Sequence, residues 1–328
     1  MKIKKVIIIN ISLIIIFLLS LEILARIYIG IKRGDSTAGL TERTLNLKYQ
    51  PFMMFGPNWA DVYKEFKNNT ETNVELRVLL TGGSTAQAFP VEILEQKLTK
   101  LTNIKVKVYN SGYGGYISTQ ELILITRFSK LIEPDIIINL NTANDLLHSI
   151  REGNQPETFF LNNTYEILLK KPYLGSFIYF LQHSQLFNGL IRLGVRNKSF
   201  NAQDYDEYID VLAQNIENIN YYCDGANILY LNVMQPHVAF KNIKHVNENN
   251  FTAYKYREEI IKQLYESAYE KIKKNSGHFL DSRFIFNNNT SHIFSDDVHF
   301  VDNAGYNLLG SAISEKITSI LIENKHLN

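Results

Sequence analysis

Residues 77 to 89 read RVLLTGGSTAQAF, an apolar run that ends in two glycines, a serine and a threonine. A short apolar run that is closed by glycine is typical of a buried strand. The polar turn after such a strand can cradle a phosphate, can simply reverse the chain, or can carry a nucleophile. The rest of the chain decides between these three readings.

Four further runs resemble the first one, and they alternate with stretches of helical periodicity. The expected strands are 77–82, 104–112, 135–142, 227–236 and 278–286. The expected helices are 91–101, 118–132, 204–222, 251–275 and 303–323. This alternation predicts an α/β fold of three layers, α/β/α, with a parallel sheet between helices. In such sheets the reactive groups gather at the carboxyl ends of the strands.

We divide the chain into a segment 1–33, a stalk and lead-in segment 34–75 with weak periodicity, and a main domain 76–328. A helical insertion at about 146–203 interrupts the main domain between its third and fourth strands. We interpret the insertion as an extra helical pair packed on the core. The alternative is a cap over the site that contacts substrate or membrane.

The first segment contains VIIINISLIIIFLLSLEILA at residues 6 to 25, a nearly unbroken apolar run of the length that spans a bilayer. It predicts a permanent single-pass anchor. A cleaved leader would have a shorter apolar core with a small-residue cleavage site, and a buried core helix would rarely be apolar on every face. Positive charges lie on both sides of the run, so the short N-terminal tail favours a cytoplasmic N-terminus and an extracytoplasmic main domain.

Charge and cysteine content exclude some classes of protein. The 328 residues carry a formal net charge of +1, which argues against nucleic acid as a main partner. The excess of positive charge belongs to residues 1–33, because the remainder has 28 basic and 32 acidic residues. Cys223 is the only cysteine, so an internal disulfide is excluded.

Phosphate and metal sites are poorly supported by the polar residues that follow the expected strands. GGSTAQ, at 82–87, lacks the lysine of a phosphate-binding loop, and GYGGYI, at 112–117, lacks the third glycine of a dinucleotide-binding loop. Among the eight histidines only His299 lies close to carboxylates, so no cluster of metal ligands is expected. We therefore expect neither a cofactor nor a metal.

Nucleophilic acyl chemistry fits these residues better. A serine hydroxyl needs a neighbouring base, and the base needs a carboxylate to orient it. Asp296 and His299 are three residues apart on an expected turn, so one imidazole nitrogen can contact the carboxylate while the other faces Ser84. Glycine-rich backbone at 112–115 and the amide of Asn144 can donate to an oxyanion.

The four blocks, in this order, resemble those of the SGNH (GDSL-like) hydrolase superfamily over roughly residues 77 to 322. Its Gly-Asp-Ser turn matches GGST, with Ser84 as the nucleophile, and its Asn-x-Gly-x-x-Gly stretch matches NSGYGG, with Gly115 as the oxyanion glycine. Its Gly-x-Asn-Asp block matches TAND, with Asn144 as the oxyanion amide. Its Asp-x-x-His block matches DDVH and gives Asp296 and His299.

Two departures separate this chain from the family pattern. Gly83 replaces the aspartate of the first block, a variant associated with membrane-anchored bacterial members. Thr142 replaces the glycine of the third block, where it is expected to alter the backbone near Asn144 and to narrow the pocket. Neither departure removes an expected catalytic group.

The resemblance implies a flavodoxin-like fold and a serine esterase that cleaves a short-acyl ester, an O-acetyl group on a carbohydrate being the suggested substrate. The oxyanion would be held by the N–H groups of Ser84 and Gly115 and by the Asn144 side chain. One alternative is an O-acyltransferase that uses the same site on a glycan. The others are a lipase or thioesterase that uses the apolar insert near 174–195, and a non-enzymatic carbohydrate-binding or assembly protein.

Some neighbouring residues are assigned structural roles. Asp297 is the weaker candidate for the orienting carboxylate, because spacing favours Asp296. We expect His237, after the fourth strand, in a surface loop, with a place in the site as the alternative. Tyr113 and Tyr116 are expected to pack in the ordinary way, with shaping of the pocket as the alternative.

Overall fold

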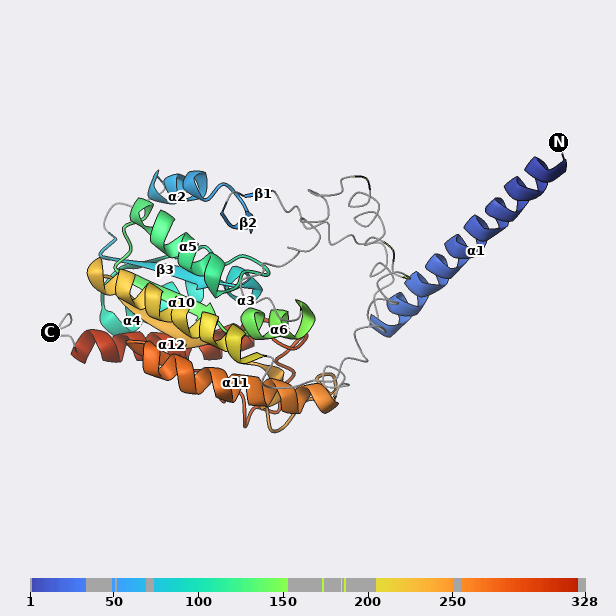
Figure 1. Cartoon of the computed structure of the whole chain (residues 1–328). Helices are drawn as coiled ribbons and strands as arrows, with labels where there is room; N and C mark the ends of the chain where they lie inside the picture. Colours follow the sequence, from blue (N-terminus) through green and yellow to red (C-terminus); the bar gives the residue numbers. More distant parts are fainter. Residues whose placement is uncertain are drawn as a thin grey trace. The chain divides into compact units, whose positions relative to one another are not determined.

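Five parallel strands pair in the order β4-β3-β5-β6-β7 in this computed structural model (Figure 1). The strands are β3 Leu76–Gly82, β4 Val106–Asn110, β5 Ile136–Asn141, β6 Leu229–Met234 and β7 His278–Asp281. The register places Leu80 of β3 beside Ile138 of β5, and Ile138 beside Leu231 of β6. All three side chains are fully buried, as expected for a parallel sheet that is covered on both faces. The predicted α/β architecture is confirmed.

The structure describes residues 2–33, 49–50, 52–68, 74–152, 173, 184, 186, 205–249 and 255–323. The chain forms two units, of which the first comprises Met1–Leu47 and Leu161–Phe200. The second unit comprises Lys48–Phe160 and Asn201–Asn328 and holds the sheet.

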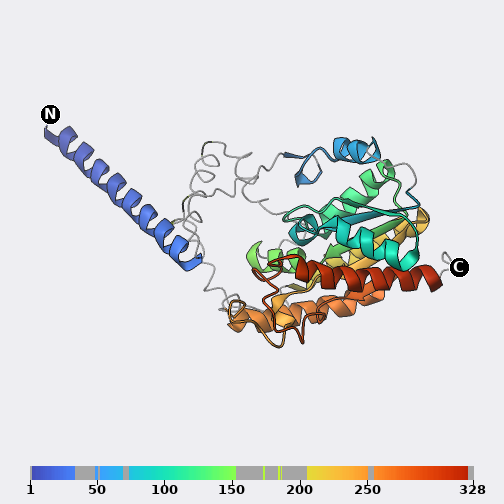
Figure 2. The ribbon, with the colours of Figure 1, turned by 180° about the vertical axis from the view of Figure 1, so that it is seen from behind.

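Helices cover both faces of the sheet. The helices α4 Val91–Thr102 and α12 Asn303–Glu323 pack against one another on one face, which Figure 2 shows from behind. There Val78 and Leu80 of β3 share an apolar cluster with side chains of both helices, such as Leu94 and Leu309. On the other face lie α5 Ser118–Phe128 and α10 Asp206–Gly225, with α11 Lys255–Asn275 packed beside α10 (Figure 1).

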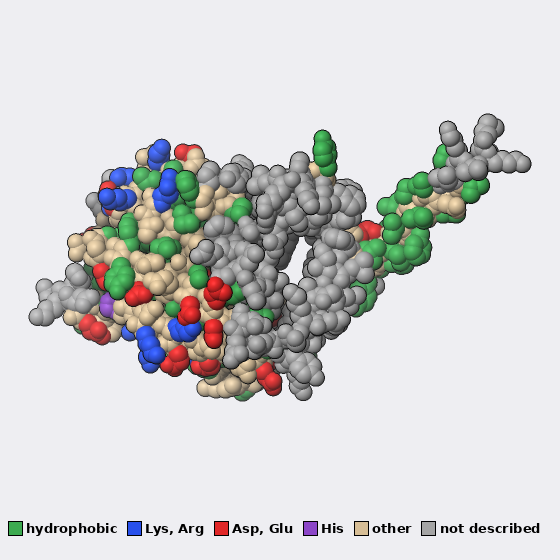
Figure 3. Space-filling view, in the orientation of Figure 1, with side chains coloured by type: hydrophobic (Ala, Val, Ile, Leu, Met, Phe, Trp, Pro, Cys, Tyr) green, Lys and Arg blue, Asp and Glu red, His purple; other side chains and the backbone are tan. Residues whose placement is uncertain are grey.

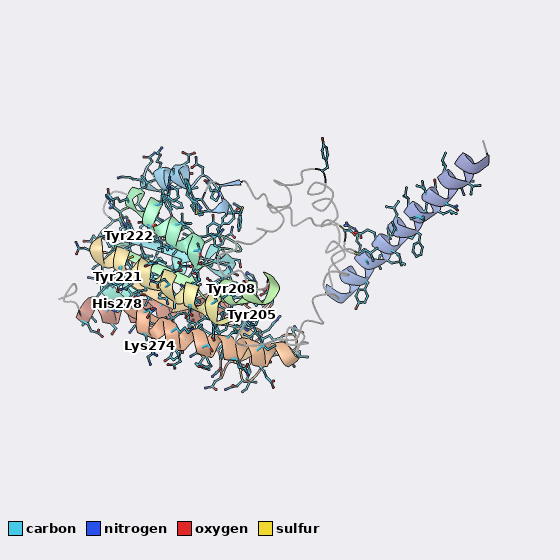
Figure 4. All side chains as sticks on the ribbon, in the orientation of Figure 1. Tyr205, Tyr208, Tyr221, Tyr222, Lys274 and His278 are labelled. Carbon is cyan, nitrogen blue, oxygen red and sulfur yellow. The ribbon has the colours of Figure 1, made fainter. Side chains whose placement is uncertain are left out.

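The α10 helix shows how the outer layer is amphipathic. Figure 4 shows its side chains, with Tyr208, Tyr221 and Tyr222 labelled. Tyr208 is buried toward the neighbouring helices, whereas Tyr221 is exposed. The Tyr222 hydroxyl lies 3.1 Å from the Ser129 hydroxyl, in the short 3₁₀ turn Ser129–Leu131 that follows α5. The helix therefore fastens to α5 along one side and faces solvent on the other.

The five predicted helices are present, and the ends of some elements differ from the prediction. The last predicted strand, 278–286, ends at Asp281 in the structure. The Asp281 carboxylate accepts hydrogen bonds from the backbone N–H of Arg283 at 3.2 Å and from its guanidinium at 2.8 Å. This local bonding turns the chain, so the apolar residues that follow leave the sheet.

Residues in the predicted lead-in segment form three elements that the sequence analysis did not predict. They are β1 Tyr49–Gln50, β2 Met54–Phe55 and α2 Trp59–Asn68. The α2 sequence carries apolar residues at helical spacing, namely Trp59, Val62, Tyr63 and Phe66, of which Trp59 and Tyr63 are buried. The Trp59 indole donates to the Tyr116 hydroxyl at 3.0 Å, and this hydroxyl donates to the Phe55 carbonyl at 2.8 Å. These bonds fasten the segment to the loop after β4.

The N-terminal helix α1, Lys2–Arg33, belongs to the first unit. Its stretch Ile8–Tyr28 has a mean hydropathy of 2.6 with none of its described residues buried, and Figure 3 shows the apolar side chains along it. The helix is long and apolar enough to cross a membrane, and a signal sequence would have the same properties. Glu22 accepts hydrogen bonds from Arg26, from the Ser184 hydroxyl and from the Leu186 N–H, at 2.8, 2.7 and 2.9 Å.

The predicted helical insertion lies mostly outside the described residues. Its first residues belong to α6, Ala143–Glu152, which follows β5 directly. Beyond α6, only Tyr173, Ser184 and Leu186 of the predicted segment are described. The expected extra helical pair therefore stays a prediction.

Candidate active site

The turn after β3 places Ser84 at the carboxyl edge of the sheet. The strand ends at Gly82, and Ser84 is the first residue of the short helix α3, Ser84–Gln87. The Ser84 side chain is partly exposed, whereas its neighbours Thr85 and Ala86 are buried. The opening stretch of the sequence therefore forms a strand, a turn and a helix start that presents one hydroxyl at the surface.

Ser84, His299 and Asp296 form a continuous hydrogen-bonded row. The Ser84 Oγ lies 2.6 Å from the His299 Nε2, and the His299 Nδ1 lies 2.7 Å from the Asp296 Oδ2. The ring therefore has a carboxylate on one nitrogen and a hydroxyl on the other. This is the arrangement in which an imidazole can accept a proton from a serine.

The backbone of its own turn holds the Asp296 carboxylate. Its Oδ1 accepts the N–H of Val298 at 2.9 Å and the N–H of His299 at 2.8 Å. Partial burial works against ionisation of Asp296, but the hydrogen bond and charge interaction with His299 and the two N–H bonds outweigh it. The pKa of Asp296 is therefore lowered below its ordinary value. The carboxylate is ionised at neutral pH and can stabilise a protonated His299.

The neighbouring carboxyl group, Asp297, belongs to a different set of contacts. Its backbone carbonyl accepts the Val238 N–H at 2.9 Å, which ties the turn to the segment after β6. Burial raises the pKa of Tyr265 on α11, and the negative charge of Asp297 acts in the same direction. The His299 ring makes its carboxylate contact with Asp296.

The loop after β4 leaves one backbone N–H without an acceptor among its described contacts. The Gly112 N–H donates to Asn110 Oδ1, and the Tyr113 N–H donates to the Gly82 carbonyl. The Gly114 N–H donates to Gln87 Oε1, and the Tyr116 N–H donates to the Tyr113 carbonyl. No described acceptor takes the N–H of Gly115, a residue with a positive φ of 82°. Of the three candidate glycines, Gly115 is therefore the one that can bind a substrate oxygen through its N–H.

Asn144 lies beside the Ser84 turn, at the start of α6. Its Nδ2 donates to the Tyr116 carbonyl at 2.7 Å, which leaves the second N–H of the same nitrogen available. A Cβ atom on Gly83 would lie only 2.2 Å from this Nδ2. Because glycine has no side chain at position 83, the Asn144 amide can lie against the turn that carries Ser84.

Thr142 adopts a backbone conformation that favours glycine. Its φ is 88°, and the side chain is fully buried, with its hydroxyl donating to Asn141 Oδ1 at 2.9 Å. A β-branched residue at positive φ is strained, at a cost of about 1 to 3 kcal/mol. The turn into α6 therefore keeps a glycine-like backbone conformation although it carries a threonine. The resulting backbone strain lies just before Asn144.

A buried bridge that the sequence analysis did not identify connects the two halves of the site. The Gln235 Nε2 donates to the Thr85 Oγ1 at 2.6 Å, and this hydroxyl in turn donates to the Val298 carbonyl at 3.4 Å. Both side chains are buried. The bridge links the turn that carries Ser84 to the Asp296–His299 turn. Thr85 follows the first expected strand, whereas Gln235 falls near the end of the expected strand 227–236 and follows β6 only in the structure.

A second support holds the segment that leads to Asp296. Lys241 and Glu248 form an ion pair of 2.6 Å whose side chains are both fully buried. The other oxygen of Glu248 accepts the N–H groups of Ile293 and Phe294, at 2.8 and 2.9 Å. Removal of either partner would leave an unpaired buried charge, so this pair fixes the path of the segment.

His237 is not in a surface loop, contrary to the prediction. Its side chain is only 4% exposed, because the chain stays buried from the end of β6 through Phe240. Its Nδ1 accepts the Ala239 N–H at 3.0 Å, and burial lowers the pKa of His237 to about 4. His237 is therefore a neutral residue behind the Asp296 turn.

Tyr113 and Tyr116 belong to an aromatic cluster beside the loop. Tyr116 is fully buried, and its ring centroid lies 5.1 Å from that of Tyr113 and 5.4 Å from that of Phe55. Tyr113 is partly exposed. Ordinary packing therefore accounts for Tyr116, whereas Tyr113 packs on one side and meets solvent on another.

Among the residues that the structure describes, no group of three or more histidine, cysteine, aspartate or glutamate side chains could hold a metal ion. Cys223 is buried and unpaired.

No protein-family model and no curated protein sequence matches the chain. Several solved structures are similar to it. One is the acetyl xylan esterase AlAXEase, at 13% identity and a TM-score of 0.44 over 75% of this chain and 100% of that chain. Another is a catalytic mutant of Axe2, an acetylxylan esterase from Geobacillus stearothermophilus, at 11% identity and a TM-score of 0.46 over 76% and 96%. A third is a GDSL-like lipase from Bacteroides thetaiotaomicron, at 14% identity and a TM-score of 0.43 over 80% and 100%.

Proposed function

We propose that this protein is a serine esterase that hydrolyses short-acyl esters, with O-acetylated carbohydrate as the substrate class. The observation that carries the proposal is the row of contacts from Ser84 Oγ to His299 Nε2 at 2.6 Å and from His299 Nδ1 to Asp296 at 2.7 Å. The available donors of Gly115 and Asn144 beside this row support it. Acyl transfer requires these groups together.

In the first half of the reaction, Ser84 Oγ attacks the ester carbonyl carbon while His299 Nε2 accepts the hydroxyl proton. Asp296 stabilises the imidazolium that forms. The N–H groups of Ser84 and Gly115 and the second N–H of the Asn144 amide bind the oxyanion of the tetrahedral intermediate. The intermediate collapses when the C–O bond to the alcohol breaks, and His299 returns the proton to that alcohol.

In the second half, a water molecule attacks the acyl group on Ser84 while His299 accepts a proton from it. The bond to Ser84 Oγ then breaks, His299 protonates this oxygen, and the carboxylic acid leaves. If the hydroxyl of a second carbohydrate replaces the water, the same steps transfer the acyl group. The two reactions differ only in the group that attacks the acyl-enzyme.

The test compares the full chain, in detergent, with its Ser84→Ala variant. We expect p-nitrophenyl acetate hydrolysis to fall by about 10³-fold or more and labelling by a fluorophosphonate to disappear, because both need the nucleophile. Ser295→Ala is the matched control, because this exposed hydroxyl donates only to backbone carbonyls of its own turn. A folded wild type that neither hydrolyses nor becomes labelled would contradict the proposal and favour a binding protein.

A chain-length series separates the esterase from a lipase or thioesterase. We expect kcat/KM to fall when the acyl group of p-nitrophenyl esters grows beyond about four carbons, since a short-acyl site has no room for a longer chain. Rates that rise with chain length would instead indicate a lipid substrate.

A further inference from the structure

Gln87 lies one helical turn after the nucleophile. It is the last residue of α3, Ser84–Gln87, so its side chain leaves the helix on the same face as that of Ser84. Gln87 is exposed, whereas Thr85 and Ala86 between the two are buried. The core therefore does not require a glutamine at this position.

The orientation of the Gln87 amide is fixed by the oxyanion loop. The Gly114 N–H donates to the Gln87 side chain at 2.9 Å. A backbone N–H can only donate, so the atom that accepts it must be the amide oxygen. The Nε2 group, with two N–H donors, then points away from Gly114, and no described residue accepts from it. The chain thus holds an exposed donor in a defined direction.

This donor lies close to the reacting groups. A Cβ atom on Gly114 would lie 3.2 Å from Gln87 Oε1 and 3.8 Å from Ser84 Cβ, so both side chains border the same small volume. Gly115, with its available N–H, is the next residue. A substrate ester placed on Ser84 and Gly115 would have the Gln87 amide beside it.

We propose that the Gln87 Nε2 group donates a hydrogen bond to a hydroxyl oxygen of the substrate that neighbours the reacting ester. The inference rests on the proposed esterase function and deepens it, because it names the residue that selects esters of polyhydroxylated alcohols. The acyl carbonyl oxygen is bound by the oxyanion donors, so the partner of Gln87 must be a different oxygen. An ester of a polyol has a hydroxyl on the next carbon, whereas an ester of a simple alkanol has none.

Two acetate esters with the same three-carbon alcohol skeleton test the proposal. Glyceryl 1-monoacetate carries two free hydroxyls, and propyl acetate carries none. The quantity measured is the kcat/KM for glyceryl monoacetate divided by that for propyl acetate, with the full chain in detergent. Any change in the oxyanion loop affects both esters, so it cancels in this ratio.

The variants are Gln87→Glu, which keeps an acceptor for the Gly114 N–H but loses the donor, and Gln87→Met, which loses both. We expect each to lower the ratio by about 3- to 10-fold, the worth of one neutral hydrogen bond. Gln263→Met, at an exposed position of α11, is the matched control and leaves the ratio unchanged. A ratio that stays at the wild-type value in both Gln87 variants overturns the proposal.

This experiment separates failure of the inference from failure of the proposed function. A wild type that hydrolyses propyl acetate, with a ratio that is insensitive to Gln87, overturns only the role of Gln87. A wild type that hydrolyses neither ester and resists a fluorophosphonate overturns the esterase itself. If the fluorophosphonate labels Ser84 but neither ester is hydrolysed, each ester is added as a competitor of the labelling. The ratio then compares how strongly the two esters slow the labelling of Ser84. An unchanged competition ratio in the Gln87 variants again overturns the proposal.

Discussion

Asp296 and Asp297 are adjacent carboxylic acids with different neighbours. Asp296 contacts the His299 ring at 2.7 Å, whereas the backbone of Asp297 is tied to Val238. We predict that Asp296→Asn lowers kcat by about 10³- to 10⁴-fold, because the imidazole loses the charge that stabilises its protonated form. Asp297→Asn, its matched control, should lower kcat by less than about 10-fold. Hydrolysis of p-nitrophenyl acetate measures both.

The reverse order of effects would assign the orienting role to Asp297. Thermal unfolding of both variants is the necessary control, because Asp296 also binds two N–H groups of its turn. A variant that is inactive but unfolds at the wild-type temperature has lost chemistry and not structure.

Gly83 and Asn144 form a second pair whose effects should be coupled. A Cβ at position 83 would lie 2.2 Å from the Asn144 Nδ2, although the Gly83 φ of −81° suits any residue. We predict that Gly83→Ala lowers kcat by about 10- to 100-fold, because the new methyl group displaces an oxyanion donor. Asn144→Ala should cost about 10²- to 10³-fold.

A double-mutant cycle checks the mechanism of this effect. In the Asn144→Ala background, Gly83→Ala should lower kcat by less than about 3-fold, because the group that it displaces is already absent. Independent, multiplicative losses would mean that position 83 acts by another route.

The sequence allowed the prediction of residues whose role depends on their position after a strand. Ser84, Asn144, Asp296 and His299 each follow a strand or precede the last helix, and the structure brings the first, third and fourth into hydrogen-bond contact. Contacts between side chains from distant elements could not be predicted in this way. The bridge from Gln235 to Thr85 joins residues 150 positions apart, and periodicity reports only on local neighbours.

At the scale of elements, the buried carboxyl group of Asp145 connects two helices beside β5, and the buried carboxyl group of Glu121 interacts with its charge. The Asp145 carboxylate accepts the backbone N–H of Ser118 at 3.0 Å and its hydroxyl at 2.6 Å, which fastens α6 to the start of α5. Burial raises the pKa of Asp145 to about 6, although these hydrogen bonds act in the opposite direction. Burial, together with the charge of Asp145, also raises the pKa of Glu121 well above its ordinary value.

This arrangement predicts a pH-dependent stability. The folded protein holds the Asp145 proton up to about pH 6, whereas the unfolded chain releases it near pH 4. The folded state therefore binds more protons between these values, and its stability falls as the pH rises through them. The whole effect amounts to about 3 kcal/mol, at about 1.4 kcal/mol per pKa unit.

Asp145→Asn should remove this part of the pH dependence, because the amide does not ionise. We expect the free energy of unfolding of the variant, relative to wild type, to rise from pH 4 to pH 7 in urea titrations. Glu121→Gln is the companion variant and should act in the same direction. A difference between wild type and Asp145→Asn that stays constant with pH would mean that folding does not raise the pKa of Asp145.

The bounds of the helices show where the local sequence pattern is sufficient to predict an element. The expected helix 303–323 has the same bounds as α12, because it has an unbroken apolar stripe against β3 and α4. The α2 helix was not predicted, although its apolar residues have helical spacing, because the pattern is confined to residues 59–66 inside a segment whose overall periodicity is weak.

At the scale of the whole molecule, α1 is long and apolar enough to cross a membrane. We propose that α1 is a permanent anchor with its N-terminus in the cytoplasm and the main domain outside. In intact cells, a membrane-impermeant maleimide should then label Gln263→Cys but not Lys4→Cys. The native Cys223 is buried and should not interfere.

Each other outcome of this labelling has a defined meaning. Labelling of Lys4→Cys alone would mean that the orientation is reversed. A mature protein whose mass lacks the first residues would mean that α1 is a cleaved leader. The interspersed charges on the second unit, visible in Figure 3, are compatible with an aqueous surface on either side.

The contact between Ser84 and His299 joins positions 215 residues apart along the chain. Under the proposed function, translation completes the nucleophile long before its base exists. A premature stop codon anywhere between the two would release a protein with a serine that is no more reactive than any surface hydroxyl. If Ser84 and His299 act as proposed, a copy truncated between them is therefore inert.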